Sequence, residues 1–97
     1  MLYYSNQDHY HVYIEEDGDD VWVSVHNGYC RPYDCIVGTV DDGLTNHQRV
    51  KSALYCFSAV EYVKENLSEN DTWQRKNRVL RAADEIEDAL ARAVEIG

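Results

Sequence analysis

Histidine and cysteine side chains in the first 35 residues have the donor types of a zinc or copper site. His9 and His11 share one side of a predicted strand, and His26 lies on the next. Cys30 and Cys35 follow, but their spacing is longer than a C-X2-C turn, contains a proline and has no second paired cluster. We therefore predict solvated surface histidines, and neither a metal ion nor another cofactor.

No residue pattern in the chain indicates a catalytic centre. Cys56 lies between Tyr55 and Phe57 in a predicted helix, which is typical of a core or boundary thiol, and no nucleophile elbow accompanies it. Carboxylates side by side in a turn lack the burial that would give them separate acid and base roles. The five glycines are scattered and form no phosphate-binding loop. We predict that the protein is not an enzyme.

A basic cluster near the C-terminal third could contact nucleic acid, but its context argues against that role. Glu85 follows Arg81 by four residues and Arg92 follows Asp88 by four, so this helix is predicted to carry ion pairs on a solvated face. With an isoelectric point near 4.6, the whole chain would repel a duplex. We expect no direct nucleic-acid binding by the cluster, which consists of Arg75, Lys76, Arg78 and Arg81.

The net charge of −9 is concentrated in one half of the chain. Residues 1–48 contain nine acidic side chains and one basic side chain, whereas residues 49–97 contain nine acidic and eight basic ones. Such a polar field repels nucleic acid and anionic lipid and attracts a partner with a basic groove. The acidic residues of the first half are Asp8, Glu15, Glu16, Asp17, Asp19, Asp20, Asp34, Asp41 and Asp42, and the one base is Arg31.

Aromatic residues are interleaved with these acids and are of the kind that anchor protein interfaces. Acidic groups would steer a cationic partner toward the surface, and aromatic groups would hold it there. The alternative is a solvated surface that protects strand edges. The residues we predict to bind a partner are Glu15, Glu16, Asp17, Asp19, Asp20, Asp41 and Asp42, with Tyr13 and Trp22 as anchors.

Alternating apolar residues predict the strands that position these groups. From His9 to Glu16 and from Asp20 to His26, every second residue is apolar, which is typical of half-buried strands. Asp17-Gly18 favours a tight hairpin turn that would place Ile14 opposite Val21 and Tyr13 opposite Trp22. A turn centred on Gly18-Asp19 would shift the pairing by two residues and keep the same side chains inside. A third strand is predicted over 33–40, after Asn27-Gly28 and Arg31-Pro32 interrupt the pattern.

Helical spacing dominates the second half of the chain. Thr45 and Gln48 match a capping box, and an apolar series at helical intervals runs from Val50 to Leu67. A second helix is predicted to start near Asn70 or Asp71 and to end near Glu95. Its predicted inward residues are Trp73, Leu80, Ala83, Ile86, Leu90 and Val94.

These elements predict an α+β fold with the order β-β-β-α-α. Two helices cover one face of a three-stranded antiparallel sheet, and the face bearing Tyr13, Trp22 and the histidines is left to solvent, a partner or a second copy of the chain. The 97 residues, 44% of them hydrophobic, predict a single domain over 1–97, with an acidic, aromatic-rich sheet in 1–43 and a helical layer in 44–97.

Cysteine usage and the N-terminus predict a cytoplasmic protein. The three cysteines are odd in number, and no basic stretch followed by an apolar stretch opens the chain. We therefore expect reduced thiols. No apolar run reaches the roughly 18 residues that span a bilayer, and we expect no membrane association.

The chain resembles the small acidic inhibitors of phages and other mobile elements, the DNA-mimic anti-CRISPR and anti-restriction proteins. The resemblance is carried by Glu15-Glu16-Asp17-Gly18-Asp19-Asp20, by Asp41-Asp42, by the aromatic-rich opening and by the strand-then-helix order. It implies a non-catalytic protein, in the host cytoplasm if phage-encoded, that occupies the nucleic-acid groove of a CRISPR effector, restriction enzyme or nuclease. The basic stretch over 75–81 departs from an all-acidic mimic and places the mimicking surface on the sheet and loops.

Two other functions use the same features. An immunity protein or antitoxin would apply the same electrostatics to a basic nuclease toxin. A metal-binding module would instead rest on His9, His11 and His26.

Overall fold

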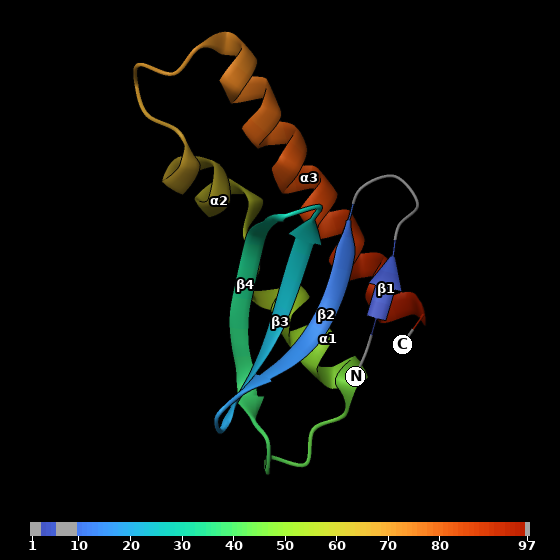
Figure 1. Ribbon diagram of the computed structural model, residues 1–97. Coiled ribbons are helices and arrows are strands. Elements are labelled where there is room, and N and C mark those ends of the chain that lie inside the picture. The colour runs from blue at the N-terminus through green and yellow to red at the C-terminus, as the bar shows by residue number, and fades with distance from the viewer. Residues whose placement is uncertain (1–2, 6–9, 97) are drawn as a thin grey trace.

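The computed structural model describes residues 3–5 and 10–96, except for the side chain of Tyr3 (Figure 1). Asp8 and His9 lie outside the described residues. Four strands precede three helices: β1 Tyr3–Ser5, β2 His11–Asp17, β3 Asp20–Asn27, β4 Cys30–Thr39, α1 Asn46–Cys56, α2 Ala59–Asn66 and α3 Trp73–Ile96.

The sheet has four antiparallel strands in the order β1-β2-β3-β4, so the prediction of three strands is wrong. The extra strand, β1, pairs with β2 and places Tyr4 opposite Val12. Its three residues are too short to show an alternating pattern, which is why the sequence did not reveal it. Tyr4 is nevertheless buried, and β1 packs against α3. Tertiary contact, rather than local sequence pattern, establishes this strand.

The hairpin of β2 and β3 turns at Gly18-Asp19. Asp17 pairs with Asp20, and Gly18 has a φ of +61°. Positive φ at only the first central residue is the pattern of a type II′ turn. Ile14 therefore lies opposite Val23, and the predicted Ile14–Val21 pairing is wrong by two residues. Because the shift is even, the buried face is unchanged.

Strand β4 begins at Cys30, three residues before the predicted start, and includes Pro32. The register against β3 shifts between Val25 and Asn27, which creates a bulge around the proline. Proline donates no ladder hydrogen bond and is tolerated at bulges and on edge strands, and β4 is an edge strand. The bulge explains why a sequence interruption lies within a strand.

The first predicted helix is in fact two helices. The capping box is confirmed, because the Gln48 amide nitrogen donates to Thr45 Oγ1 over 3.1 Å and Gln48 Oε1 accepts from the Thr45 amide over 2.9 Å. The chain becomes extended at Phe57, and Ser58 caps α2 by accepting from the amide of Glu61 over 3.3 Å. Ser58-X-X-Glu61 is itself a helix-start signal within the apolar series. The break lets Phe57 enter the core, where it is 8% exposed.

Helix α3 begins and ends within a few residues of its predicted bounds, but its first half is not buried. Ala83, Ile86 and Leu90 are in the core as predicted, whereas Trp73 and Leu80 are 76% and 50% exposed. The predicted inward positions of these two residues are wrong. The first half of α3 extends past the end of the sheet, where α2 lies beside it (Figure 1).

The core lies between the sheet and the helices. Val12, Val23, Ile86 and Leu90 are all fully buried in one cluster, and each such side chain contributes about 1.5–3 kcal/mol by leaving water. No helix covers the opposite face of the sheet in the part of the chain that the structure describes (Figure 1). None of the described helices is long and apolar enough to cross a membrane.

Candidate functional site

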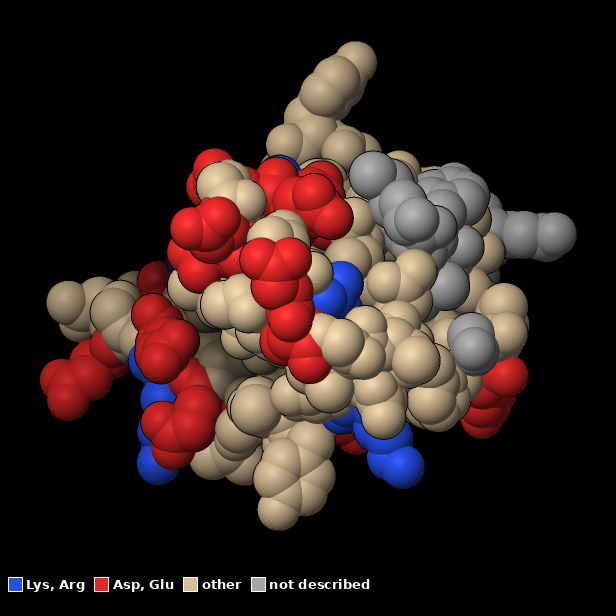
Figure 2. Space-filling view, turned by 90° about the horizontal axis from the view of Figure 1, so that it is seen from below, with Lys and Arg blue, Asp and Glu red and all other residues tan. Residues whose placement is uncertain are grey.

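Two turns meet at one end of the sheet and bring the predicted acidic residues together. The hairpin turn of β2 and β3 is one, and the loop between β4 and α1 is the other. The Val40 amide donates to the Asp19 carbonyl oxygen over 3.0 Å, and Asp20 pairs with Thr39. Acidic side chains gather at this end in the view of Figure 2. Pairing of β3 with β4 thus unites two acidic segments that are about twenty residues apart in the sequence.

The carboxylates at this end divide into unpaired and paired groups. The unpaired ones are exposed and make no side-chain hydrogen bond or ion pair with any described residue. Salt screens charges beyond a Debye length of about 8–10 Å, so carboxylates gathered on two adjoining turns reinforce one another's field most strongly at low salt. We define the acidic end as these five residues: Glu16, Asp17, Asp19, Asp20 and Asp41.

Asp42 has a structural role. Its carboxylate accepts hydrogen bonds from the amides of Thr39 and Leu44, each over 2.9 Å, and from Arg49 Nη2 over 2.9 Å. The Leu44 amide, followed by Arg49, holds the pKa of Asp42 below its ordinary value. Since Arg49 balances its charge, Asp42 adds little to the field of the acidic end.

Glu15 is also held within the protein. Its Oε2 accepts from Ser24 Oγ and from Arg31 Nη2, each over 3.1 Å, and its Oε1 lies 3.7 Å from His26 Nε2. Arg31 Nη1 lies 3.7 Å from Asp34 Oδ2. The single base of the first 48 residues is therefore engaged by two carboxylates on the open sheet face.

A hollow of about 280 Å³ on this face joins Trp22 to the acidic end. Four carboxylates and the Arg31 guanidinium line the hollow together with Trp22, so the formal charge of the lining is negative. An indole beside unbalanced carboxylates suits a cationic group, through cation–π attraction and ion pairing. We call it the Trp22 hollow, and its lining is Glu15, Glu16, Asp17, Trp22, Arg31 and Asp34.

Only one of the two predicted anchors lies in this hollow. Tyr13 pairs with Ser24 across the strands, not with Trp22, so the predicted Tyr13–Trp22 pairing is wrong. Tyr13 instead packs edge-on against His26, with ring centroids 4.9 Å apart. Arg31 and Asp34 were not predicted as site residues. The bulge hid the outward position of Arg31. Asp34 lies opposite Ser24, and simple alternation along the strand could have placed it on the open face.

The histidine and cysteine candidates that the structure describes do not assemble, and His9 lies outside the described residues. His11 lies opposite His26 on the open face, whereas Cys35 lies opposite buried Val23 and so is on the helix side of the sheet. Cys30 is exposed in a turn-flanking position. Within residues 3–5 and 10–96, no group of three or more potential ligands is placed to hold a metal ion.

The basic stretch on α3 is only partly paired. The Nε of Arg75 lies 3.3 Å from Asp71 Oδ1, and the Nε of Arg92 lies 2.9 Å from Asp88 Oδ2. The expected pairing of Arg81 with Glu85 does not form among the described side chains, because Glu85 hydrogen-bonds with Tyr10. This stretch lies at the opposite end of the molecule from the acidic end (Figure 1).

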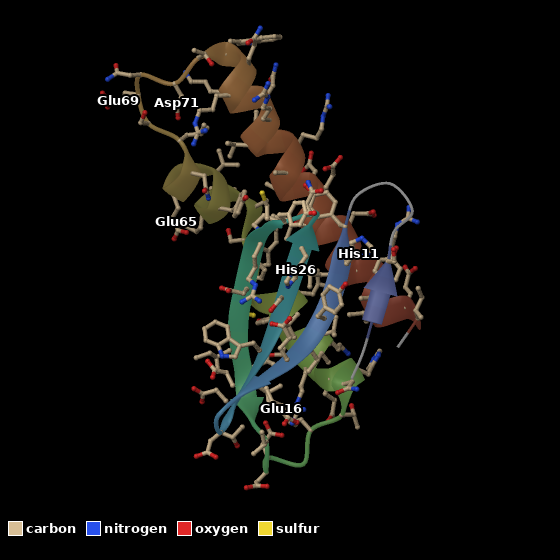
Figure 3. All side chains as sticks on the ribbon, viewed as in Figure 1. His11, Glu16, His26, Glu65, Glu69 and Asp71 are labelled. Atoms are coloured by element: carbon tan, nitrogen blue, oxygen red, sulfur yellow. The ribbon has the colours of Figure 1, made fainter. Side chains whose placement is uncertain are left out.

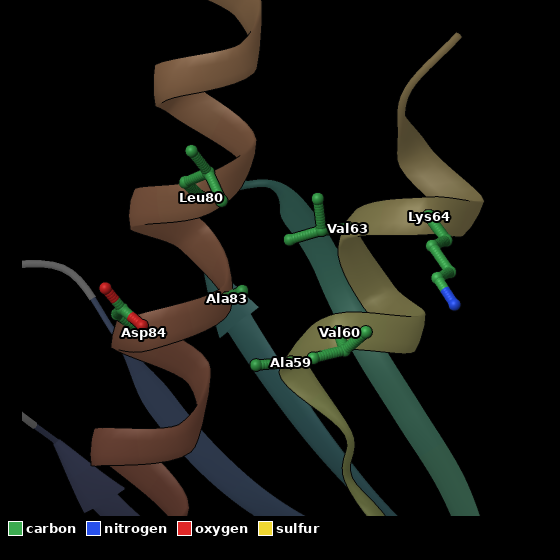
Figure 4. Close-up of a pocket in the computed structure, with 7 residues that line it drawn as sticks. All are labelled: Ala59, Val60, Val63, Lys64, Leu80, Ala83 and Asp84. Carbon is green, nitrogen blue, oxygen red and sulfur yellow. The ribbon is translucent and has the colours of Figure 1, made fainter.

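A second hollow, of about 300 Å³, lies between α2 and α3. Val63 from α2 and Leu80 from α3 line it, while Lys64 and Asp84 point away from its centre (Figure 4). Leu80 and Val60, which also lines it, are exposed by 50% and 63%. The groove is apolar and uncharged at its centre, so it differs in chemistry from the Trp22 hollow.

Comparison with known proteins gives no relative from which a function could be transferred: no family model, curated protein or solved structure matches this chain.

Proposed function

We propose that this protein is a non-catalytic cytoplasmic inhibitor that places its acidic end in the cationic groove of a nucleic-acid-handling protein, such as a CRISPR effector or a restriction enzyme. One observation carries the proposal. Five unpaired carboxylates from the β2–β3 hairpin and the β4–α1 loop converge at one end, while Arg31 and Arg49 are engaged by other acids. The unbalanced negative charge is therefore presented to an external partner.

Electrostatic steering and blockade of the groove provide the mechanism. Negative potential at the acidic end raises the rate of encounter with a basic groove, and the effect weakens as salt screens it. The Trp22 hollow then receives an arginine or lysine side chain of the partner, with the indole contacting the cation and the carboxylates pairing with it. Nucleic acid is excluded because its own phosphates need the same cations.

The arrangement of the carboxylates supports binding in preference to catalysis. Acid–base catalysis requires two carboxyl groups whose environments separate their proton affinities, usually through burial of one. The residues of the acidic end are exposed alike. A repeated array of solvated negative charges is suited to matching a row of partner cations.

Charge reversal tests the proposal. Asp17, Asp19 and Asp41 are changed together to lysine, and a control variant carries lysine at Glu69, Glu87 and Glu95, which are exposed elsewhere. Both variants have the same net charge, so only the position of the charge differs. Inhibition of DNA binding is measured by gel shift against a panel of purified CRISPR effectors and restriction enzymes, after capture of partners from bacterial lysate.

We expect the first variant to lose inhibition and the control to retain it, and we expect inhibition to weaken with added salt. Full inhibition by the Asp17, Asp19 and Asp41 variant, or complexes unaffected by strong salt, would refute the proposal. Capture of a basic nuclease toxin encoded next to this gene would assign the same surface to an immunity protein or antitoxin.

A further inference from the structure

Three aromatic rings from different elements meet beside α2, far from the acidic end. Tyr33 comes from β4, Phe57 from the break between α1 and α2, and Tyr62 from α2. The ring centroids of Tyr33 and Phe57 are 4.8 Å apart with planes at 71°, and those of Phe57 and Tyr62 are 5.9 Å apart with planes at 54°. These are the angles of edge-to-face and tilted aromatic packing, and all three residues also line one cavity, where ring faces can attract a cation.

A cavity of about 190 Å³ opens beside these rings. It is several times larger than the roughly 30 Å³ of one water molecule but below the roughly 300–1,000 Å³ of pockets for drug-sized ligands. It can therefore admit a small head group and not a whole nucleotide or cofactor. Its lining consists of Tyr33, Cys56, Phe57, Ser58, Glu61, Tyr62 and Glu65.

The charged part of the lining is acidic. Glu61 and Glu65 are four residues apart on α2 and thus occupy the same face of the helix. Glu61 is 3.8 Å from Lys64 in an exposed pair, whereas Glu65 has no ion pair with any residue that the structure describes. Glu65 projects from α2 on the side away from α3 (Figure 3). A cation in the cavity would gain a carboxylate partner that is otherwise unmatched.

The phenols of the lining remain neutral across the physiological range. Burial raises the pKa of Tyr33 and of Tyr62 above the ordinary tyrosine value. Their rings thus act as neutral aromatic surfaces, whose negative faces attract a cation. None of the described residues that line the cavity is basic.

We propose that this cavity binds a methylated ammonium group, such as the head group of choline or the side chain of trimethyllysine. Such a cation is weakly hydrated and apolar at its surface, so it fits rings and carboxylates together better than a plain ammonium, which is strongly hydrated. The site is independent of the proposed inhibition, because it uses a different end of the molecule and different residues (Figures 1 and 3).

Titration of the full chain with choline tests the site, with amide chemical shifts as the readout. The control ligand is the uncharged carbon isostere of choline, in which a tert-butyl group replaces trimethylammonium. We expect saturable shifts confined to the neighbourhood of residues 33, 56–58 and 61–65 with choline, and at least about tenfold weaker binding of the isostere. Equal binding of the two ligands, or absence of saturable shifts with choline, would overturn the proposal. A parallel titration with a short trimethyllysine peptide identifies which source of the group binds more tightly.

Paired variants separate the site from general effects of charge and stability. Tyr62→Leu removes a ring and Glu65→Gln removes a charge; Tyr55→Leu and Glu69→Gln make the same changes outside the cavity. We expect each of the first pair to weaken choline binding by about fivefold, and the second pair to leave it unchanged. Circular dichroism verifies folding of every variant. If both Tyr62→Leu and Glu65→Gln bind choline as tightly as the wild type, choline binds at another site and the proposal is contradicted.

Discussion

Arg49 on α1 donates from Nη2 to Asp42 Oδ1 over 2.9 Å, and the same nitrogen donates to the Thr39 carbonyl oxygen over 3.2 Å. Arg49 is only 9% exposed. This buried guanidinium connects the end of β4, the following loop and the first helix. It thereby fixes the loop that carries Asp41 beside the hairpin turn, and the acidic end depends on it.

Removal of the Asp42 carboxylate should destabilise the fold, whereas removal of its neighbour should not. Asp42→Ala leaves two backbone amides without their acceptor and the buried Arg49 without its carboxylate partner, so we expect the melting temperature to fall by about 5–10 °C. Asp41→Ala is the matched control, since Asp41 is exposed and unpaired among the described residues, and should change the melting temperature by less than about 2 °C. Thermal unfolding followed by circular dichroism makes the comparison. Equal melting temperatures for the two variants would contradict this structural role.

Gly38 should be intolerant of a side chain. Its φ is +144°, and an added Cβ would collide with the Asp42 carboxylate. We expect Gly38→Ala to cost about 2–4 kcal/mol, and Gly43→Ala, at a φ of +74° with open space around it, to cost about 1 kcal/mol. Urea unfolding measures both. Because Asp42 is the colliding group, the double variant Gly38→Ala/Asp42→Ala should lose less free energy of unfolding than the two single variants together. Strictly additive losses would argue against the contact.

Acid should weaken the fold through two carboxylates with lowered pKa. Backbone hydrogen bonding, aided by Arg49 for Asp42 and by Arg75 for Asp71, holds each pKa below 3.8. A pKa lower in the folded than in the unfolded state gives stability that is complete above about pH 4 and is lost as pH falls through the folded value. Urea midpoints measured from pH 5 to pH 2 should therefore decline, and Asp42→Ala should flatten the decline. An unchanged slope in that variant would contradict the assignment to Asp42.

Alkali should weaken the fold through buried phenols. Burial, followed by the hydrogen bond with Glu85, raises the pKa of Tyr10 to about 12. A raised folded-state pKa means that the stabilisation is complete below pH 10 and is lost as pH rises from 10 toward 12. Phenolate absorbance near alkaline pH should show a late-titrating group that is absent in Tyr10→Phe. If Tyr10→Phe keeps every late-titrating tyrosine of the wild type, the burial argument for Tyr10 is contradicted.

The two tryptophans should differ in binding. Trp22 lines the Trp22 hollow, whereas Trp73 is 76% exposed on α3. If a partner cation contacts the indole of Trp22, Trp22→Leu should weaken the complex with the inhibited protein by about tenfold or more, and Trp73→Leu should have little effect. Calorimetry with the captured partner compares them. A larger loss from Trp73→Leu would place the interface on the helical end.

Periodicity predicted the central hairpin and the core of α3, and a four-residue motif predicted the capping box. Each of these features is encoded within a short stretch of sequence. Val12 and Val23 alternate with polar neighbours, and Ile86 and Leu90 are four residues apart. Features that depend on distant partners were missed. The strand at Tyr4 forms because it pairs with β2 and packs against α3. Leu80 is exposed because the sheet ends before it reaches this part of α3.

The sequence by itself determined the sign and segregation of the charge, the alternation that buries one side of each central strand, and the composition of the acidic segments. Only the tertiary structure decided which carboxylates stay unpaired and can contact a partner. Pairing of β3 with β4 brought Asp19 beside Val40 and so joined the two turns, while Arg49 and Arg31 neutralised Asp42 and Glu15. The physical reason is that charge is a local property of each side chain, whereas its pairing depends on which groups folding places within a few ångströms of one another.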